Sequence, residues 1–154
     1  MDLPPEIVAK QVTVPGGAYR KFHEYGTEGG GPKPRFFFIL NKSPENDKDL
    51  IIVTSTTQIS SRYKARYYKV LVRVSPNEYN SLPEESLIDC NSAEKIPKSN
   101  IVNWIKDQKI TPLPPLPDSV LNRLRDAIKH SSNLNTKEKR LVLGSDMNIE
   151  QESQ

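Results

Sequence analysis

The hydrophobic positions in the first ninety residues fall in short runs, which polar, glycine-rich or proline-rich segments separate. Residues 35–40 read RFFFIL and residues 50–57 read LIIVTSTT. Aromatic or β-branched runs of this length, bounded by turn residues, are typical of buried β-strands. Over residues 67–74 every second position is apolar, which indicates that one face of this strand packs on the core. We therefore predict strands at residues 18–25, 35–40, 50–57, 67–74 and 86–90.

The period of the pattern becomes helical after residue 98. Ser99 can cap a helix whose apolar stripe is made by Ile101, Val102 and Ile105, with Trp104 beside it. A second stripe recurs at three- and four-residue spacing behind Asp118, the predicted N-cap; it consists of Val120, Leu121, Leu124 and Ile128. Four prolines in residues 111–117 keep the chain between the two helices extended.

Strands come first and helices last, and no helical pattern separates the strands. This order disfavours a parallel βαβ architecture, since each parallel crossover needs a dozen or more residues, usually a helix. The predicted fold class is mainly β with C-terminal helices (α+β), built as a compact antiparallel barrel or curled sheet. We expect an N-terminal extension at residues 1–17, the barrel with its helices at 18–130, and a polar tail at 131–154 that is flexible or folds on a partner.

Composition narrows the classes of function. The 154 residues suffice for one domain. The only cysteine is Cys90, so an internal disulfide is excluded, and two histidines make a histidine-rich metal centre implausible; we expect neither metal nor cofactor. The longest apolar run, residues 36–40, is far shorter than a membrane span, and the first residues, MDLPP, do not resemble a signal peptide. We therefore expect a cytoplasmic protein with no membrane partner.

The densest basic stretch of the chain is residues 62–69, RYKARYYK, with Arg73 following it. Cations can bind phosphates and the interleaved rings can stack on unpaired bases, which is the composition of a nucleic-acid surface. The net charge of +3 agrees with such a partner without requiring it. The alternative is a solvated strand face whose tyrosines pack sideways. The candidate RNA-binding residues here are Arg62, Lys64, Arg66, Tyr67 and Lys69.

An ordered set of segments resembles the MazF/PemK-like toxins of type II toxin–antitoxin systems. The set comprises GGGPKPRFFFILN at residues 29–41, LIIVTSTTQI at 50–59, SLIDCN at 86–91 and the helix from Asp118, within residues 19–130. The resemblance implies an SH3-like small β-barrel of the MazF/PemK/CcdB type that forms a homodimer. It also implies metal-independent cleavage of single-stranded RNA and a cognate antitoxin as protein partner.

The resemblance also implies positions for the chemistry. Attack of a ribose 2′-OH on the neighbouring phosphorus needs a base, an acid and a cation for the charge on the phosphate oxygens. A lysine stands where the family has the arginine of its Arg-Pro, with an arginine two residues on, and the family's Thr-x-Gln falls on residues 56–58. A histidine and Glu24 resemble a His-Glu pair of some members. The catalytic candidates are thus Lys33, Arg35, Thr56 and His23, and Gln58 joins the RNA-binding candidates.

Two departures from the family keep other functions open. The family arginine is Lys33 here, and the Arg-Cys-Asp triplet of some members reads Asp89, Cys90 and Asn91. A member that binds nucleic acid or a protein target such as DNA gyrase without cutting RNA is the first alternative. A small-barrel adaptor that offers residues 112–117 to a proline-recognising domain is the second, against a plain connector for the same segment.

Overall fold

The computed structural model describes Pro4, Ile7, Lys10 and residues 13–22, 34–57 and 68–144, with Phe22, Pro34 and Tyr68 described by their backbone alone. Within these residues the strands are β1 Ala18–Phe22, β2 Pro34–Ile39, β3 Asp49–Thr56, β4 Leu71–Val74, β5 Ser86–Asp89, β6 Glu94–Pro97 and β7 Ile110–Leu113. The helices are α2 Lys98–Lys106, α3 Asp118–Ile128 and α4 Thr136–Leu143, and the short 3₁₀ turns are η2 Tyr68–Val70 and η3 Cys90–Ser92.

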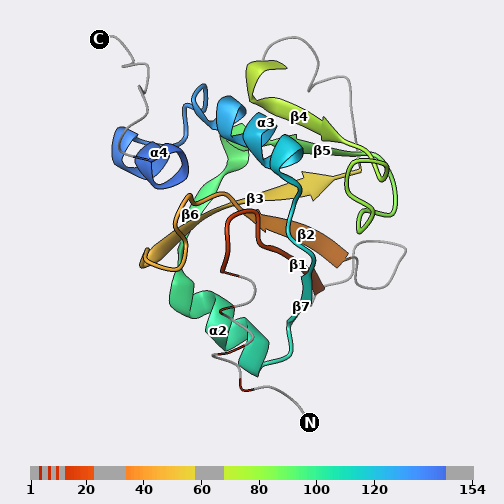
Figure 1. Ribbon diagram of the computed structural model, residues 1–154, viewed down its shortest axis with the longest axis vertical. Helices are drawn as coiled ribbons and strands as arrows, with labels where there is room; N and C mark the ends of the chain where they lie inside the picture. The colour runs from red at the N-terminus through yellow and green to blue at the C-terminus, as the bar shows by residue number, and fades with distance from the viewer. Residues whose placement is uncertain are drawn as a thin grey trace, which may run out of the picture.

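The strands form one antiparallel sheet in the order β4-β5-β3-β2-β1-β7, with β6 as a further partner of β3 (Figure 1). On one side β3 pairs with β2, and on the other it pairs first with β6 and then, from Ser55, with β5. The helices α3 and α4 lie over one face of the sheet and α2 lies against the other (Figure 1). The predicted fold class, mainly β with C-terminal helices, is therefore confirmed.

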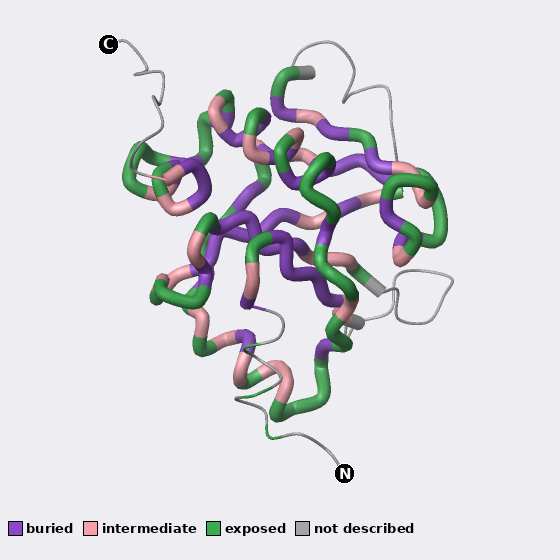
Figure 2. The backbone as a smooth tube through the Cα atoms, viewed as in Figure 1, coloured by how far each residue is buried: buried purple, intermediate pink, exposed green. Residues whose placement is uncertain are grey.

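The central strand β3 is buried on both faces (Figure 2). Ile51 and Val53 belong to the larger hydrophobic cluster, which α3 and α4 complete, whereas Leu50 and Ile52 belong to the smaller cluster under α2. Because alternate residues of a strand point to opposite faces, the four consecutive apolar residues of β3 supply both clusters. The uninterrupted run seen in the sequence is thus the signature of a strand with a core on either side.

Several boundaries differ from the sequence prediction. Residues 68–70 form the turn η2 and not the start of a strand, although Val70 is still buried as predicted. Both helices begin before the predicted position: α2 starts at Lys98, two residues early, and α3 at Asp118, one residue early, and neither has a side-chain cap. Prolines occupy the N-cap positions, with φ near −63°, the value that a proline ring imposes. The predicted caps Ser99 and Asp118 are therefore wrong.

The structure also differs from the predicted flexible tail over residues 131–144. Helix α4 is closed at its start by a reciprocal capping box, in which Asn135 Oδ1 accepts from the Glu138 amide at 2.8 Å and Glu138 accepts from the Asn135 amide at 2.9 Å. Val142 and Leu143 are buried against α3 and β3. The short apolar patch at 141–143 is thus the inner face of a docked helix.

The proline-rich segment, residues 112–117, joins the β7 region to α3 and packs against the rest of the domain. Pro112 belongs to β7 and pairs with Tyr19 of β1, and Leu116 is buried. The Leu116 amide donates to the Gly16 carbonyl at 2.9 Å, and the Tyr79 hydroxyl donates to Pro114. These contacts hold the segment against β1, Gly16 and Tyr79. The connector interpretation is favoured over the adaptor.

Among the described residues, no helix combines the length and the apolar character that crossing a membrane requires.

A buried asparagine holds the hairpin between β2 and β3. Asn41 is fully buried; its Oδ1 accepts from the Ile51 amide at 2.7 Å, and its Nδ2 donates to Asp47 Oδ2 at 2.8 Å and to the Asp49 carbonyl at 3.0 Å. One amide side chain therefore satisfies three groups of the turn and of β3.

We expect Asn41→Ala to lower the free energy of unfolding by about 2 kcal/mol, because it leaves the buried Ile51 amide without a partner. Urea denaturation followed by tryptophan fluorescence measures this change. Asn77→Ala, at an exposed asparagine, is the matched control and should stay within about 0.5 kcal/mol of the parent. Equal stabilities for the two variants would contradict the role assigned to Asn41.

Candidate nucleic-acid interface

Three strands present polar side chains at the same end of the sheet: β1 ends there, β2 begins there and β3 ends there. Lys21 of β1 pairs directly with Arg35 of β2. The ladder between β2 and β3 ends at the pair of Phe37 and Thr54, and the same register carried two residues further puts Arg35 across from Thr56. Two-residue steps keep a side chain on its face, so all these positions share the face of Phe37. The register thus gathers two cations and a hydroxyl.

Like charges directly opposite each other destabilise a sheet, and Lys21 and Arg35 are such a pair. Lys21 is held in place by Trp104 of α2, with Nζ 3.7 Å from the ring centroid. The ring of Trp104 in turn leans on Tyr19, which stacks on Phe37 at 5.3 Å. Two cations at paired strand positions therefore lie beside a cluster of aromatic rings, and such an arrangement suits an anionic ligand.

The backbone of β3 near Thr56 is held by its neighbouring strands. Thr54 Oγ1 donates to the carbonyl of Phe36, the residue after Arg35, at 3.0 Å and so links β3 to β2. Thr56 pairs with Leu87 of β5, so its backbone is held from the other side. Arg35 is exposed and Thr56 is half-buried. A ligand can therefore reach Arg35 beside a hydroxyl whose backbone position is set by β3.

Most of the other predicted site residues lie outside the described residues. These are Lys33, His23, Gln58, Arg62, Lys64, Arg66 and Tyr67. In the sequence, Lys33 immediately precedes the first residue of β2, and Gln58 follows Thr56 by two residues. Their roles stay predictions. Lys21 was not among the sequence candidates, because only the pairing of β1 with β2 shows that it lies opposite Arg35.

Lys69 does not join Arg35 and Thr56. It lines a pocket of about 350 Å³ at η2, β4 and α3, with β5 and β3 between it and β2 in the sheet order. Arg73, Arg123 and His130 line the same pocket. Arg123 and His130 were not among the sequence candidates, because they belong to α3 and the turn after it, 54 and 61 residues after Lys69. Lys21 and Arg35 thus lie in one place, and the cations that line this pocket lie in another.

The triplet at residues 89–91 has structural contacts. Asp89 caps η3 by accepting from the Asn91 amide at 2.9 Å, and Asn91 Oδ1 accepts from the Ser132 amide at 2.8 Å. Cys90 is fully buried, as predicted for a small apolar residue, and burial followed by the charge of Asp89 raises the pKa of its thiol to about 12. These contacts give the triplet a role in joining β5 to the turn after α3.

We expect the Cys90 thiol to react with a disulfide reagent at pH 8 about a thousandfold more slowly in the folded protein than after unfolding in urea, because the thiolate is the reactive form and burial suppresses it. Absorbance of the released thiol measures both rates, and free cysteine serves as the control. A folded sample that reacts as fast as free cysteine would contradict the buried position.

Comparison with known proteins identifies no family by sequence: no family model matches the chain, and no curated protein does. Among solved structures, an endoribonuclease in complex with its cognate antitoxin from a mycobacterial species aligns with a TM-score of 0.48 and 17% identity, covering 79% of this chain and 96% of that chain. A MazE–MazF complex from Deinococcus radiodurans aligns with a TM-score of 0.48 and 14% identity, covering 77% and 94%. At this level the likeness carries no conclusion about the chemistry of this chain.

Proposed function

We propose that this protein is the toxin of a type II toxin–antitoxin system and a metal-independent endoribonuclease that cleaves single-stranded RNA at the Arg35–Thr56 end of the sheet. The observation that carries the proposal is the cross-strand pair of Lys21 and Arg35 at that end. Two cations held opposite each other are unfavourable for the sheet alone and favourable for a bound phosphate. The ordered resemblance of residues 19–130 to the MazF/PemK-like toxins supplies the reaction class.

The proposed reaction requires a base, an acid and a cation. In the proposed reaction the ribose 2′ oxygen forms a bond to phosphorus, and the bond from phosphorus to the 5′ oxygen breaks. A base takes the 2′ proton and an acid returns a proton to the 5′ oxygen, so the products are a 2′,3′-cyclic phosphate and a 5′-hydroxyl. The exposed guanidinium of Arg35 suits the charge that builds on the other two phosphate oxygens, because its planar fork reaches both.

Thr56 and Lys21 complement Arg35. The Thr56 hydroxyl would orient the phosphate, and its backbone is fixed by pairing with β5. Lys21 adds a second positive charge from β1. His23 is the proposed acid or base, since an ordinary histidine pKa lies near neutrality, and Lys33 is proposed as a further cation.

The partners follow from the same proposal. A surface that binds RNA through cations is blocked most simply by an acidic segment of another protein, and this is the role proposed for a cognate antitoxin. We also propose a homodimer, as the resemblance implies.

The alternative that the structure leaves in place is a protein that binds RNA without cutting it. Its support is the triplet at residues 89–91, whose contacts bind chain segments together and which lacks the ionic pair of some MazF/PemK-like members. The cleavage assay separates the two functions directly.

We expect the purified protein to cut a long single-stranded RNA in EDTA, and Arg35→Ala to lower the rate at least about a hundredfold by removing stabilisation of the transition-state charge. Thr56→Ala should lower it at least about tenfold. Primer extension maps the cuts, and end-group analysis should find 2′,3′-cyclic phosphates.

Each control variant removes the same type of side chain as a test variant, from an exposed position outside the proposed site. Arg140→Ala removes an exposed arginine from α4, and Thr57→Ala removes the exposed threonine next to Thr56; both should cut as the parent does. If Arg35→Ala also cuts at the parental rate, the assigned site is wrong. Uncut RNA that is retained by the folded parent would instead establish the non-cleaving binder.

A further inference from the structure

The second group of cations lines a pocket of nucleotide size. Its volume of about 350 Å³ falls within the range of small-molecule sites, and its walls come from three elements: η2, β4 and α3 with the turn after it. Lys69, Arg73, Arg123 and His130 contribute the basic groups, and Asp126 is the one acidic residue of the lining. Leu71, Val72 and Ala127 complete the lining with apolar surface.

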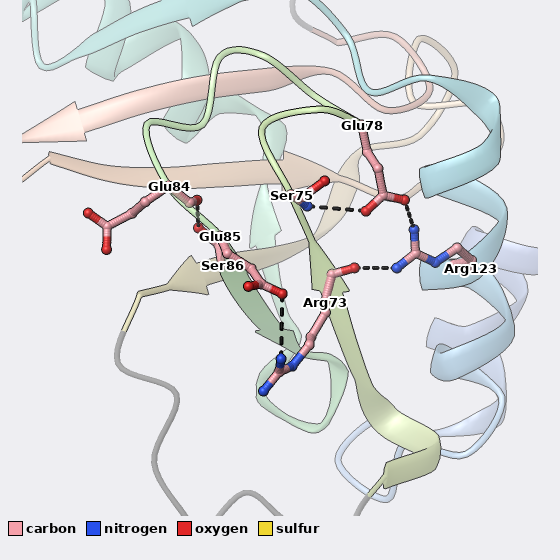
Figure 3. A network of polar contacts seen from close by, with 7 residues as sticks. All are labelled: Arg73, Ser75, Glu78, Glu84, Glu85, Ser86 and Arg123. Carbon is pink, nitrogen blue, oxygen red and sulfur yellow. Dashed lines mark hydrogen bonds and ion pairs between the residues drawn. The ribbon is translucent and has the colours of Figure 1, made fainter.

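Arg73 and Arg123 make polar contacts that use only some of their N–H donors (Figure 3). Arg123 donates to Glu78 and to the Arg73 carbonyl, and Arg73 donates to Glu85 at 3.5 Å. The pKa of the Glu78 carboxyl lies below its ordinary value, because the Ser75 amide donates to it and Arg123 lies against it. Since a guanidinium has five N–H donors, both arginines keep donors for a ligand. Neither glutamate lines the pocket.

The charge of the lining is positive. Lys69 is exposed and forms no ion pair with another described residue. Asp126 is paired with Lys129 at 3.3 Å, which offsets the one negative charge of the lining. Arginine and lysine at the rim of a small pocket are suited to phosphate, arginine through its fork and lysine as a point charge.

We propose that this pocket binds the phosphate group of a nucleotide, with the sugar or base against Leu71 and Ala127. The phosphate belongs to a second nucleotide of the RNA strand that is bound at the Arg35–Thr56 end of the sheet, so this inference rests on the proposed function. Lys69 supports that source, because it is the last residue of the basic stretch 62–69 and reaches the pocket from the chain segment that follows β3. The pocket then adds affinity for longer RNA and takes no part in the bond-breaking step.

Fluorescence anisotropy with a labelled 2′-O-methyl oligonucleotide tests the proposal, because such a strand has no free 2′-hydroxyl and cannot be cut. We expect Lys69→Gln and Arg73→Gln each to weaken binding about tenfold and to reduce the slope of log K against log salt by about 0.7. Lys137→Gln, which removes one exposed lysine charge from α4, is the matched control and should bind as the parent does. Circular dichroism confirms that each variant is folded.

Titration with AMP, followed by the amide signals of Leu71 and Ala127, distinguishes the sources of phosphate. If AMP shifts these signals while Lys69→Gln and Arg73→Gln bind the oligonucleotide as Lys137→Gln does, the pocket takes free nucleotides and the RNA source is overturned. If AMP shifts nothing and the variants match the control, the whole inference is overturned. This experiment measures binding and not cleavage, so its outcome is separate from that of the cleavage assay. Weakened binding in both pocket variants supports the pocket inference even if the protein does not cut RNA. If RNA is cut in an Arg35-dependent way and the pocket variants bind as the control does, the pocket inference is wrong and the proposed function stands.

Discussion

The structure depends on one constraint, the burial of β3 on both faces. Leu50 and Ile52 supply the cluster under α2, and Ile51 and Val53 supply the cluster under α3 and α4. A strand buried on both sides must have covering elements on both sides, so the late helices cannot all pack on one face. The sheet is correspondingly arranged with β3 at its centre, where it pairs with three other strands.

The proposed site lies where the pairing of β3 changes. The ladder with β2 ends at Thr54, and from Ser55 the strand pairs with β5. At this point β2 presents Arg35 and β1 presents Lys21, two like charges at paired strand positions. Unfavourable local arrangements that a fold retains are commonly found at functional sites. The aromatic contact between Lys21 and Trp104 shows how the surrounding structure holds this one.

Much of the fold could be predicted from the sequence, because the pattern reports burial directly. The apolar runs of β2 and β3 and the stripe of α3 are strong signals. By contrast, β6 has Ile96 as its one buried residue and β7 contains a proline, so their strand character depends on their neighbours. Helix α4 is mostly polar, and the Asn135–Glu138 spacing was the one local signal for its start.

The candidate site could be predicted in part. Arg35 and Thr56 were found from a resemblance between ordered segments, and the structure brings them to one end of the sheet. Lys21 requires the register of β1, and the contact between Arg123 and β4 requires the docking of α3. Both are relations between segments far apart in the sequence, which a single chain's pattern does not encode.

The central claim is that the ends of β1, β2 and β3 form one RNA-binding surface. Titrating the isotopically labelled protein with an uncleavable single-stranded oligonucleotide, and following backbone amide signals, tests it most directly. We expect the signals of Lys21, Arg35 and Thr56 to shift together with a common dissociation constant. Shifts confined to other parts of the molecule, with these three unchanged at saturation, would contradict the claim.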